Sequence, residues 1–245
     1  MLLERGLELA QADWKGRELE VESHVLREYF LEPCNGCYST ASAMCNFSCT
    51  CFPGDDITTK IYPAIMKADV MLWSTPVNQS MVSTRVKTVL DRLISLDGGY
   101  FIPELPIKDS KFRAASQKLS QKDVRYDSRM FGKVAAYFIT SKDFANPLEE
   151  SAPYPKEFRG ENYDTFTAGA IAHQGAEYGW FHADPWFAIS TATHDRELQY
   201  DKDEYDGLKV DHEYAKMVVT AALDLGEKHI DKPPKLTSKG RVNRT

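Results

Sequence analysis

The chain has 245 residues, of which 42% are hydrophobic and 11% aromatic, so it is long enough to bury a substantial core. Its formal net charge of −6 provides no overall basic field, which argues against a nucleic-acid partner and favours a small molecule or a protein. No apolar run reaches the roughly 18 residues that a membrane-spanning helix needs, and charged residues interrupt the N-terminus where a signal peptide would be apolar. These features predict a cytoplasmic protein that does not bind membranes.

The first quarter of the chain is predicted to contain two helices and a strand. An amphipathic helix is expected from residue 1 to about residue 12, and alternating apolar and polar residues predict a half-buried strand at 18–26. Asp55 and Asp56 open a further helix, because acidic side chains favour the positive end of a helix. Pro63 is expected to kink or shorten that helix.

Continuous apolar runs at 70–74 and 134–140 predict two buried strands, each followed by a polar loop. The other expected elements are helices at 81–96, 165–178 and 211–228 and a Pro-interrupted strand at 180–190. Strands that alternate with helices predict an α/β fold with an open, doubly wound parallel sheet. In such sheets ligands bind beyond the carboxyl ends of the strands.

The chain is predicted to form one domain at residues 1–232, followed by a disordered basic tail at residues 233–245. Two insertions are expected within the domain. The first, at 33–53, is rich in cysteine, and the second, at 97–130, is polar and contains many helix-breaking residues.

The segment STPVNQSMVSTRVKTVLDR, which follows an apolar strand and has cysteines upstream of it, resembles the flavodoxin-like NADPH-dependent FMN reductases and their iron–sulfur flavoprotein relatives. The resemblance implies a flavodoxin-like sheet of strand order 2-1-3-4-5 with FMN across its carboxyl edge. It implies an oxidoreductase that passes electrons from NAD(P)H through the flavin to a small-molecule or protein acceptor. Homo-oligomers are common among these relatives, so a homo-oligomer is expected.

The same resemblance places the flavin between two loops. The residues expected to bind it are Thr75, Pro76, Val77, Asn78, Gln79 and Ser80 in the first loop and Thr140, Ser141, Lys142 and Asp143 in the second. Backbone groups in such loops can tune a flavin without burying side-chain charge, and Pro76 restricts the backbone of the first loop. Because the flavin carries out the hydride transfer, we predict no catalytic side chain. In the helix that follows, Asp91 and Arg92 are interpreted as part of a solvated face.

The family's first strand and its Ser-rich phosphate loop would precede the helix expected at residue 1, and the sequence contains neither. Their absence would leave the strands at 18–26 and 70–74 without a central partner. It would also lower flavin affinity, because the family holds the FMN phosphate on that loop, at a helix N-terminus. Two explanations are open, a start codon assigned too late or a variant that has lost nucleotide binding, and the amphipathic first helix favours the former.

All five cysteines lie in one short segment, as Cys34, Cys37, Cys45, Cys49 and Cys51. In a reducing compartment such a cluster favours metal or redox chemistry over a disulfide framework. Four thiolates can hold an iron–sulfur cluster or zinc, although the spacing C-x2-C-x7-C-x3-C-x1-C matches neither template. Reduced, partly buried thiols are the alternative. A bound metal would support a different function, an electron-transfer or redox-sensing module with a vestigial flavin site.

Aromatic and histidine residues in the last third of the chain are interpreted as structural. Core or subunit-interface positions are expected for Trp180, Phe181, Trp186 and Phe187, and hydrogen-bonded or surface positions for His173, His182 and His194.

Overall fold

A computed structural model describes residues 2–36, 49, 51–52, 54–78, 81–96, 130–140, 163–190 and 206–234. The chain divides into two compact units. Unit 1 comprises residues 1–20, 69–83 and 132–245, and unit 2 comprises residues 21–68 and 84–131. The sheet belongs to unit 1, whereas the segment that contains the cysteines belongs to unit 2.

A helix forms in each region where the sequence predicts one, although some of the ends differ. Unit 1 contains α1 (Leu2–Asp13), β1 (Val70–Asn78), β2 (Met81–Val82), β3 (Val134–Thr140), α6 (Tyr163–Glu177), β4 (Phe187–Ser190) and α8 (Asp206–Asp231). Unit 2 contains the 3-10 helices η1 (Leu26–Glu28) and η4 (Leu93–Ser95), the π-helical turn η3 (Ile57–Ile61), α3 (Tyr62–Lys67) and α4 (Thr84–Arg92). Pro63 lies in the first turn of α3, where its missing N–H removes no helical hydrogen bond.

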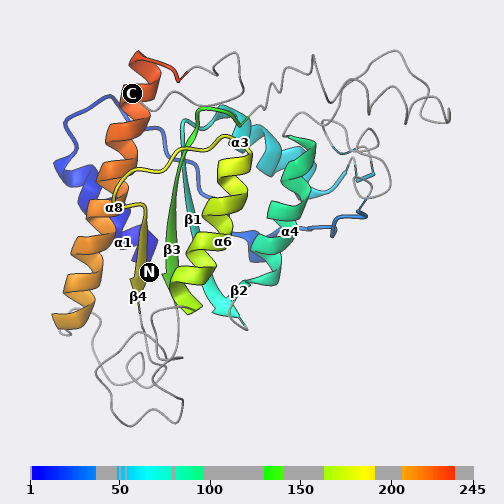
Figure 1. Ribbon diagram of the computed structural model, residues 1–245, viewed down its shortest axis with the longest axis horizontal. Coiled ribbons are helices and arrows are strands. Elements are labelled where there is room, and N and C mark those ends of the chain that lie inside the picture. Colours follow the sequence, from blue (N-terminus) through cyan, green and yellow to red (C-terminus); the bar gives the residue numbers. More distant parts are fainter. Residues whose placement is uncertain are drawn as a thin grey trace, which may run out of the picture. The chain divides into compact units, whose positions relative to one another are not determined.

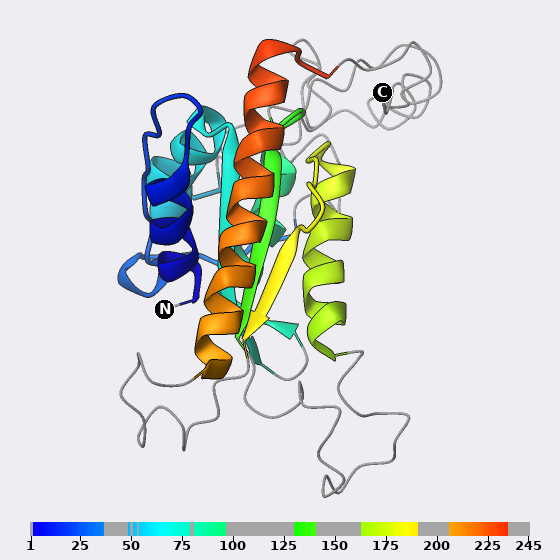
Figure 2. The same ribbon diagram turned by 90° about the vertical axis from the view of Figure 1, so that its left-hand side faces the viewer.

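The sheet has the strand order β2-β1-β3-β4. Strand β3 is parallel to both β1 and β4, and only the short β2 is antiparallel. Helices α1 and α8 lie on one face of this sheet and α6 lies on the other (Figures 1 and 2). Helices on both faces of a mostly parallel sheet confirm the predicted α/β architecture.

The face toward α1 and α8 contains the main core of unit 1. Val134, Ala136 and Phe138 of β3 are buried there, because alternate residues of a strand point to the same side. Small residues let the two helices approach closely: a Cβ added at Gly6 of α1 would lie 2.8 Å from the Cβ of Ala215 of α8. The core therefore depends on a glycine at this crossing.

The opposite face of the sheet contains stacked aromatic rings. The rings of Trp73 and Trp180 are 5.7 Å apart, and Trp180 is 4% exposed. The hydroxyl of Tyr137, the β3 residue paired with Trp73, lies 2.9 Å from Nε2 of His182. These contacts confirm that Trp180 is a core residue and that His182 is hydrogen-bonded, whereas His194 lies outside the described residues.

The strand predicted at 18–26 is not formed. Residues 18–25 belong to no strand, and Val21 and Val25 are 51% and 41% exposed, although a half-buried strand would cover them. The physical reason is the lack of a neighbour, because a strand needs backbone hydrogen-bond partners and no strand in the described part of the chain pairs with residues 18–25. The observed neighbours β1, β3 and β4 are the three strands expected to follow it.

No helix among the described residues is both long enough and apolar enough to cross a membrane.

Candidate functional site

The first predicted flavin-binding loop is largely a β-hairpin. Residues 75–78 continue β1, and Val77 and Asn78 pair with Val82 and Met81 of β2. The prediction that the strand ends at Ser74 and that the helix starts near Met81 was therefore wrong, because β2 supplies backbone partners that prolong the strand. Gln79 and Ser80 lie outside the described residues.

Thr75 fastens this hairpin internally. Its side chain is buried, its Oγ1 accepts the Ser83 N–H at 3.0 Å, and its hydroxyl lies 3.0 Å from the carbonyl oxygen of Pro76. The hydroxyl thus ties the end of β1 to the residue that precedes α4. Thr75 is suited to position the hairpin, and the groups open to a ligand belong to the residues after it.

Ends of the three parallel strands meet at one edge of the sheet. Pro76 of β1 pairs with Thr140 of β3, and Thr140 pairs with Ser190 of β4. Pro76 and Asn78 are exposed and Thr140 is partly exposed. Helix α1 also begins at this end of unit 1 (Figures 1 and 2). The two predicted loops therefore start at adjacent positions, and Ser190 is a further edge position that the sequence did not single out.

The side chains at this edge fit a flat ligand with polar atoms on its rim. Within the described residues, no side-chain hydrogen bond uses the amide of Asn78 or the hydroxyl of Thr140. Together with the backbone around Pro76 they provide donors and acceptors that can meet such a rim. Ser141, Lys142 and Asp143 lie outside the described residues, so their predicted contacts stay predictions.

An open parallel sheet with helices on both faces and a polar carboxyl edge defines unit 1 as a flavodoxin-like α/β fold. Residues 1–108 match the model of a protein family described as NADPH-dependent FMN reductase. This match confirms the resemblance inferred from the sequence. A comparison with curated proteins found no match.

Two solved structures are similar to the chain. The crystal structure of RosB with a bound intermediate, 8-demethyl-8-formylriboflavin-5'-phosphate, is 13% identical, with a TM-score of 0.54 over 95% of this chain and 73% of RosB. That likeness confirms the fold. A flavodoxin, WrbA-like protein from Agrobacterium tumefaciens is 13% identical over 66% of this chain and 71% of its own, with a TM-score of 0.36, too low to bear on the fold.

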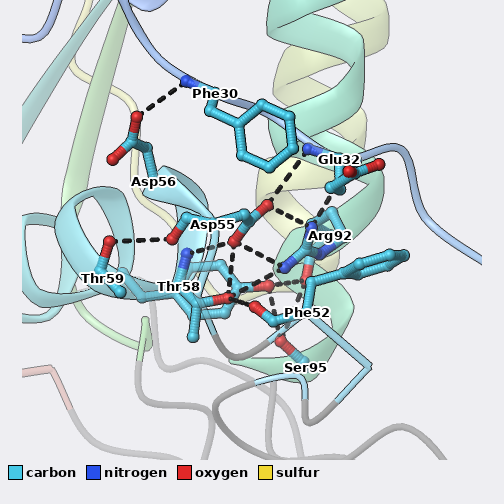
Figure 3. A network of polar contacts seen from close by, with 10 residues as sticks. Phe30, Glu32, Phe52, Asp55, Asp56, Thr58, Thr59, Arg92 and Ser95 are labelled. Atoms are coloured by element: carbon cyan, nitrogen blue, oxygen red, sulfur yellow. Dashed lines mark hydrogen bonds and ion pairs between the residues drawn. The ribbon is translucent and has the colours of Figure 1, made fainter.

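Unit 2 contains a buried ion pair that the sequence analysis missed. Arg92, the last residue of α4, is 0% exposed, and its Nη1 lies 2.8 Å from Oδ2 of Asp55 (Figure 3). Nη1 also donates to the Glu32 carbonyl at 2.9 Å, and Nη2 donates to the Thr58 hydroxyl at 3.0 Å. The interpretation of Arg92 as a solvated residue was wrong, whereas Asp91 pairs with Lys87 near the surface.

The electrostatics of this ion pair follow from its hydrogen bonds. Burial raises the pKa of Asp55, but hydrogen bonds from Arg92, from Thr58 and from the Glu32 N–H outweigh it and hold that pKa below its usual value. Burial alone would lower the pKa of Arg92, and the bond to Asp55 reverses this. Both groups are therefore charged at neutral pH, and the pair holds the start of η3 against the end of α4.

The cysteines described by the structure are Cys34, Cys49 and Cys51, and all three are thiols. No group of three or more His, Cys, Asp or Glu residues able to hold a metal ion occurs in the described part of the chain. Cys37 and Cys45 lie outside it, so the predicted iron–sulfur or zinc site stays a prediction. Burial raises the pKa of the Cys49 thiol, and the nearby Arg92 guanidinium acts in the opposite direction.

Proposed function

We propose that this protein is an FMN-dependent oxidoreductase that passes electrons from NAD(P)H through the flavin to a small-molecule or protein acceptor. The observation that carries this proposal is a coincidence of two features. The region that matches the FMN reductase family includes the β1–β2 hairpin, and this hairpin ends beside Thr140 at the carboxyl edge of the sheet. RosB, which has a similar fold, holds a riboflavin-5'-phosphate derivative, a ligand of the same chemical class as FMN.

The described residues have distinct roles in this proposal. The backbone at Pro76 and Val77, the amide of Asn78 and the hydroxyl of Thr140 would hold the polar rim of the flavin ring. Thr75 would keep the hairpin in place through its hydrogen bond with Ser83. When bound, FMN supplies the chemistry of hydride acceptance and electron transfer, so the protein contributes binding and orientation.

The phosphate end of FMN needs an anion-binding position beside the strand edge. In the described structure, α1 begins at the edge where the strands end, and the N-terminus of a helix attracts anions (Figure 2). We propose that the FMN phosphate lies at this end of unit 1. The ring would then be held along the strand edge.

Activity measurements test the proposal. Oxidation of NADH and of NADPH is followed by nicotinamide absorbance, with ferricyanide as acceptor, in the presence and absence of added FMN. The proposal predicts oxidation that needs both protein and FMN and exceeds the rate with free FMN alone. A rate equal to that of free FMN for both nucleotides, with a protein folded by circular dichroism, would contradict it.

A further inference from the structure

Two of the cysteines share a tight turn in unit 2. Cys49 and Cys51 are separated by one residue, and the Phe52 N–H donates to the Cys49 carbonyl at 3.0 Å, which closes the turn around both. Consecutive Cα atoms are about 3.8 Å apart, so the Cα atoms of these two cysteines can be no more than about 7 Å apart, which is the upper end of the span that a disulfide bridges. A turn closed in this way keeps these two Cα atoms closer together than an extended chain would, within the range that a disulfide can bridge.

Cys49 has an unusual backbone conformation. Its φ of 48° lies in the left-handed region, which residues other than glycine rarely adopt. Such a conformation persists only where the surroundings hold it, and it occurs preferentially at functional sites. At this position it fixes how the Cys49 side chain leaves the turn.

The same turn packs on the buried guanidinium of Arg92. The guanidinium carbon lies 4.6 Å from the centre of the Phe52 ring, directly after Cys51 in the chain (Figure 3). Although Nη1 and Nη2 are hydrogen-bonded, the buried Nε of Arg92 has no hydrogen-bond partner among the described residues. A buried donor without a partner is costly, and here it belongs to a cation beside a thiol.

Access differs between the two sulfurs. Cys51 is exposed, whereas Cys49 is partly buried. An external reagent therefore reaches Cys51 more readily than Cys49. This order of access matches the two steps of thiol–disulfide exchange.

We propose that Cys49 and Cys51 form a reversible dithiol–disulfide pair that exchanges with low-molecular-weight disulfides. The Cys51 thiolate attacks one sulfur of the external disulfide, breaks its S–S bond and releases the first small thiol. The Cys49 thiolate then attacks Sγ of Cys51 in the mixed disulfide and releases the second. The two cysteines lose two protons and two electrons, and the external disulfide is reduced to two thiols. Arg92 is a positioning residue, because its buried guanidinium opposes the effect by which burial raises the pKa of the Cys49 thiol.

The experiment uses the full chain with Cys37→Ser and Cys45→Ser, so that only Cys34, Cys49 and Cys51 can react. The reduced protein is incubated with glutathione disulfide, its remaining thiols are alkylated, and its intact mass is measured. We expect one alkylated thiol and one intramolecular disulfide, which dithiothreitol reverses to three alkylated thiols. Absence of the intramolecular disulfide would overturn the proposal.

Single substitutions in this background assign the pair. Cys34→Ser is the matched control and should keep the disulfide. Cys49→Ser should leave a stable glutathione adduct on Cys51, because no second thiol can resolve it, and Cys51→Ser should form neither the disulfide nor a rapid adduct. If the disulfide survives either of these last two substitutions, or is lost with Cys34→Ser, the proposal fails. Circular dichroism of each variant checks that unit 2 keeps its helices.

Discussion

At the scale of single residues, the ion pair between Arg92 and Asp55 is the clearest determinant of stability in unit 2. Both side chains are almost fully buried, so removal of one partner leaves the other charge without compensation. We predict that Asp55→Leu and Arg92→Met each lower the free energy of unfolding by about 3–5 kcal/mol in urea denaturation. The double variant should lose less than the sum of the two, because it leaves no lone charge.

The surface pair on the same helix provides the control. Lys87 and Asp91 of α4 form an exposed ion pair, so Lys87→Met should cost at most about 1 kcal/mol. Equal losses for Lys87→Met and Arg92→Met would contradict the assignment of the buried pair.

The pH dependence of stability should follow the carboxyl of Asp55. Its pKa is lower in the folded protein than in the unfolded chain, so its contribution is full above the unfolded pKa and is lost as the pH falls through the folded value. We predict that stability declines below about pH 4 and that Asp55→Asn makes this decline shallower. Urea titrations between neutral and acidic pH measure it, with Asp91→Asn as the control. An unchanged slope in Asp55→Asn would show that other carboxyl groups cause the decline.

Arg92 also shows where sequence reasoning was incomplete. It lies at the flank of the apolar stripe that Val86, Val89 and Leu90 form on α4, where helical periodicity is compatible with either burial or exposure. A buried charged residue needs a partner, and the sequence does not reveal one 37 positions away. The periodicity therefore identified neither the burial of Arg92 nor Asp55.

At the scale of elements, the crossing of α1 and α8 depends on Gly6. A methyl group there would meet both the Cβ and the backbone of Ala215, at 2.8 and 3.0 Å, so one helix must shift. We predict that Gly6→Ala destabilises the protein by about 1–3 kcal/mol in thermal or urea unfolding. Gly169 of α6 is the matched control, because its added Cβ would meet nothing within 4 Å. Gly169→Ala should be neutral or stabilising by up to about 1 kcal/mol.

Strand β1 has one paired edge and one edge that is largely open. Within the described residues, β3 pairs with it along residues 70–76, whereas β2 pairs on the other side only at Val77 and Asn78. The Val134 N–H donates to the carbonyl of Asp69, so by ladder alternation the N–H groups of Met71 and Trp73 point toward β3 and those of Leu72 and Ser74 point away.

Hydrogen exchange measured by NMR should reveal this alternation. We predict that the amides of Leu72 and Ser74 exchange at least roughly tenfold faster than those of Met71 and Trp73. Equal protection along β1 would mean that another backbone segment pairs with the open edge. The same reasoning applies to the strand predicted at 18–26. Alternating apolar and polar residues show that a segment could form a half-buried strand, but the strand forms only where a neighbouring strand pairs with it.

At the scale of the whole molecule, the parallel sheet could be predicted because its strands are short apolar runs separated by amphipathic helices. The extension of β1 into a hairpin could not be predicted, because the sequence around Val77 and Val82 is polar and has the composition of a loop. The edge at Pro76 and Thr140 was predicted through the family resemblance, which located two loops, and parallel pairing then makes them neighbours. Ser190 was missed because its strand was predicted without a following loop.

The central claim, that the carboxyl edge of this sheet binds FMN, is tested most directly by equilibrium binding. Isothermal titration of FMN into the protein should give a one-to-one complex, and Asn78→Ala should weaken it about 5- to 10-fold, the equivalent of one hydrogen bond. Gln11→Ala, which removes an exposed amide on α1, is the control and should leave the affinity unchanged. Absence of FMN binding by the folded protein, or equal affinity in the Asn78 variant and the parent, would contradict this account of the site.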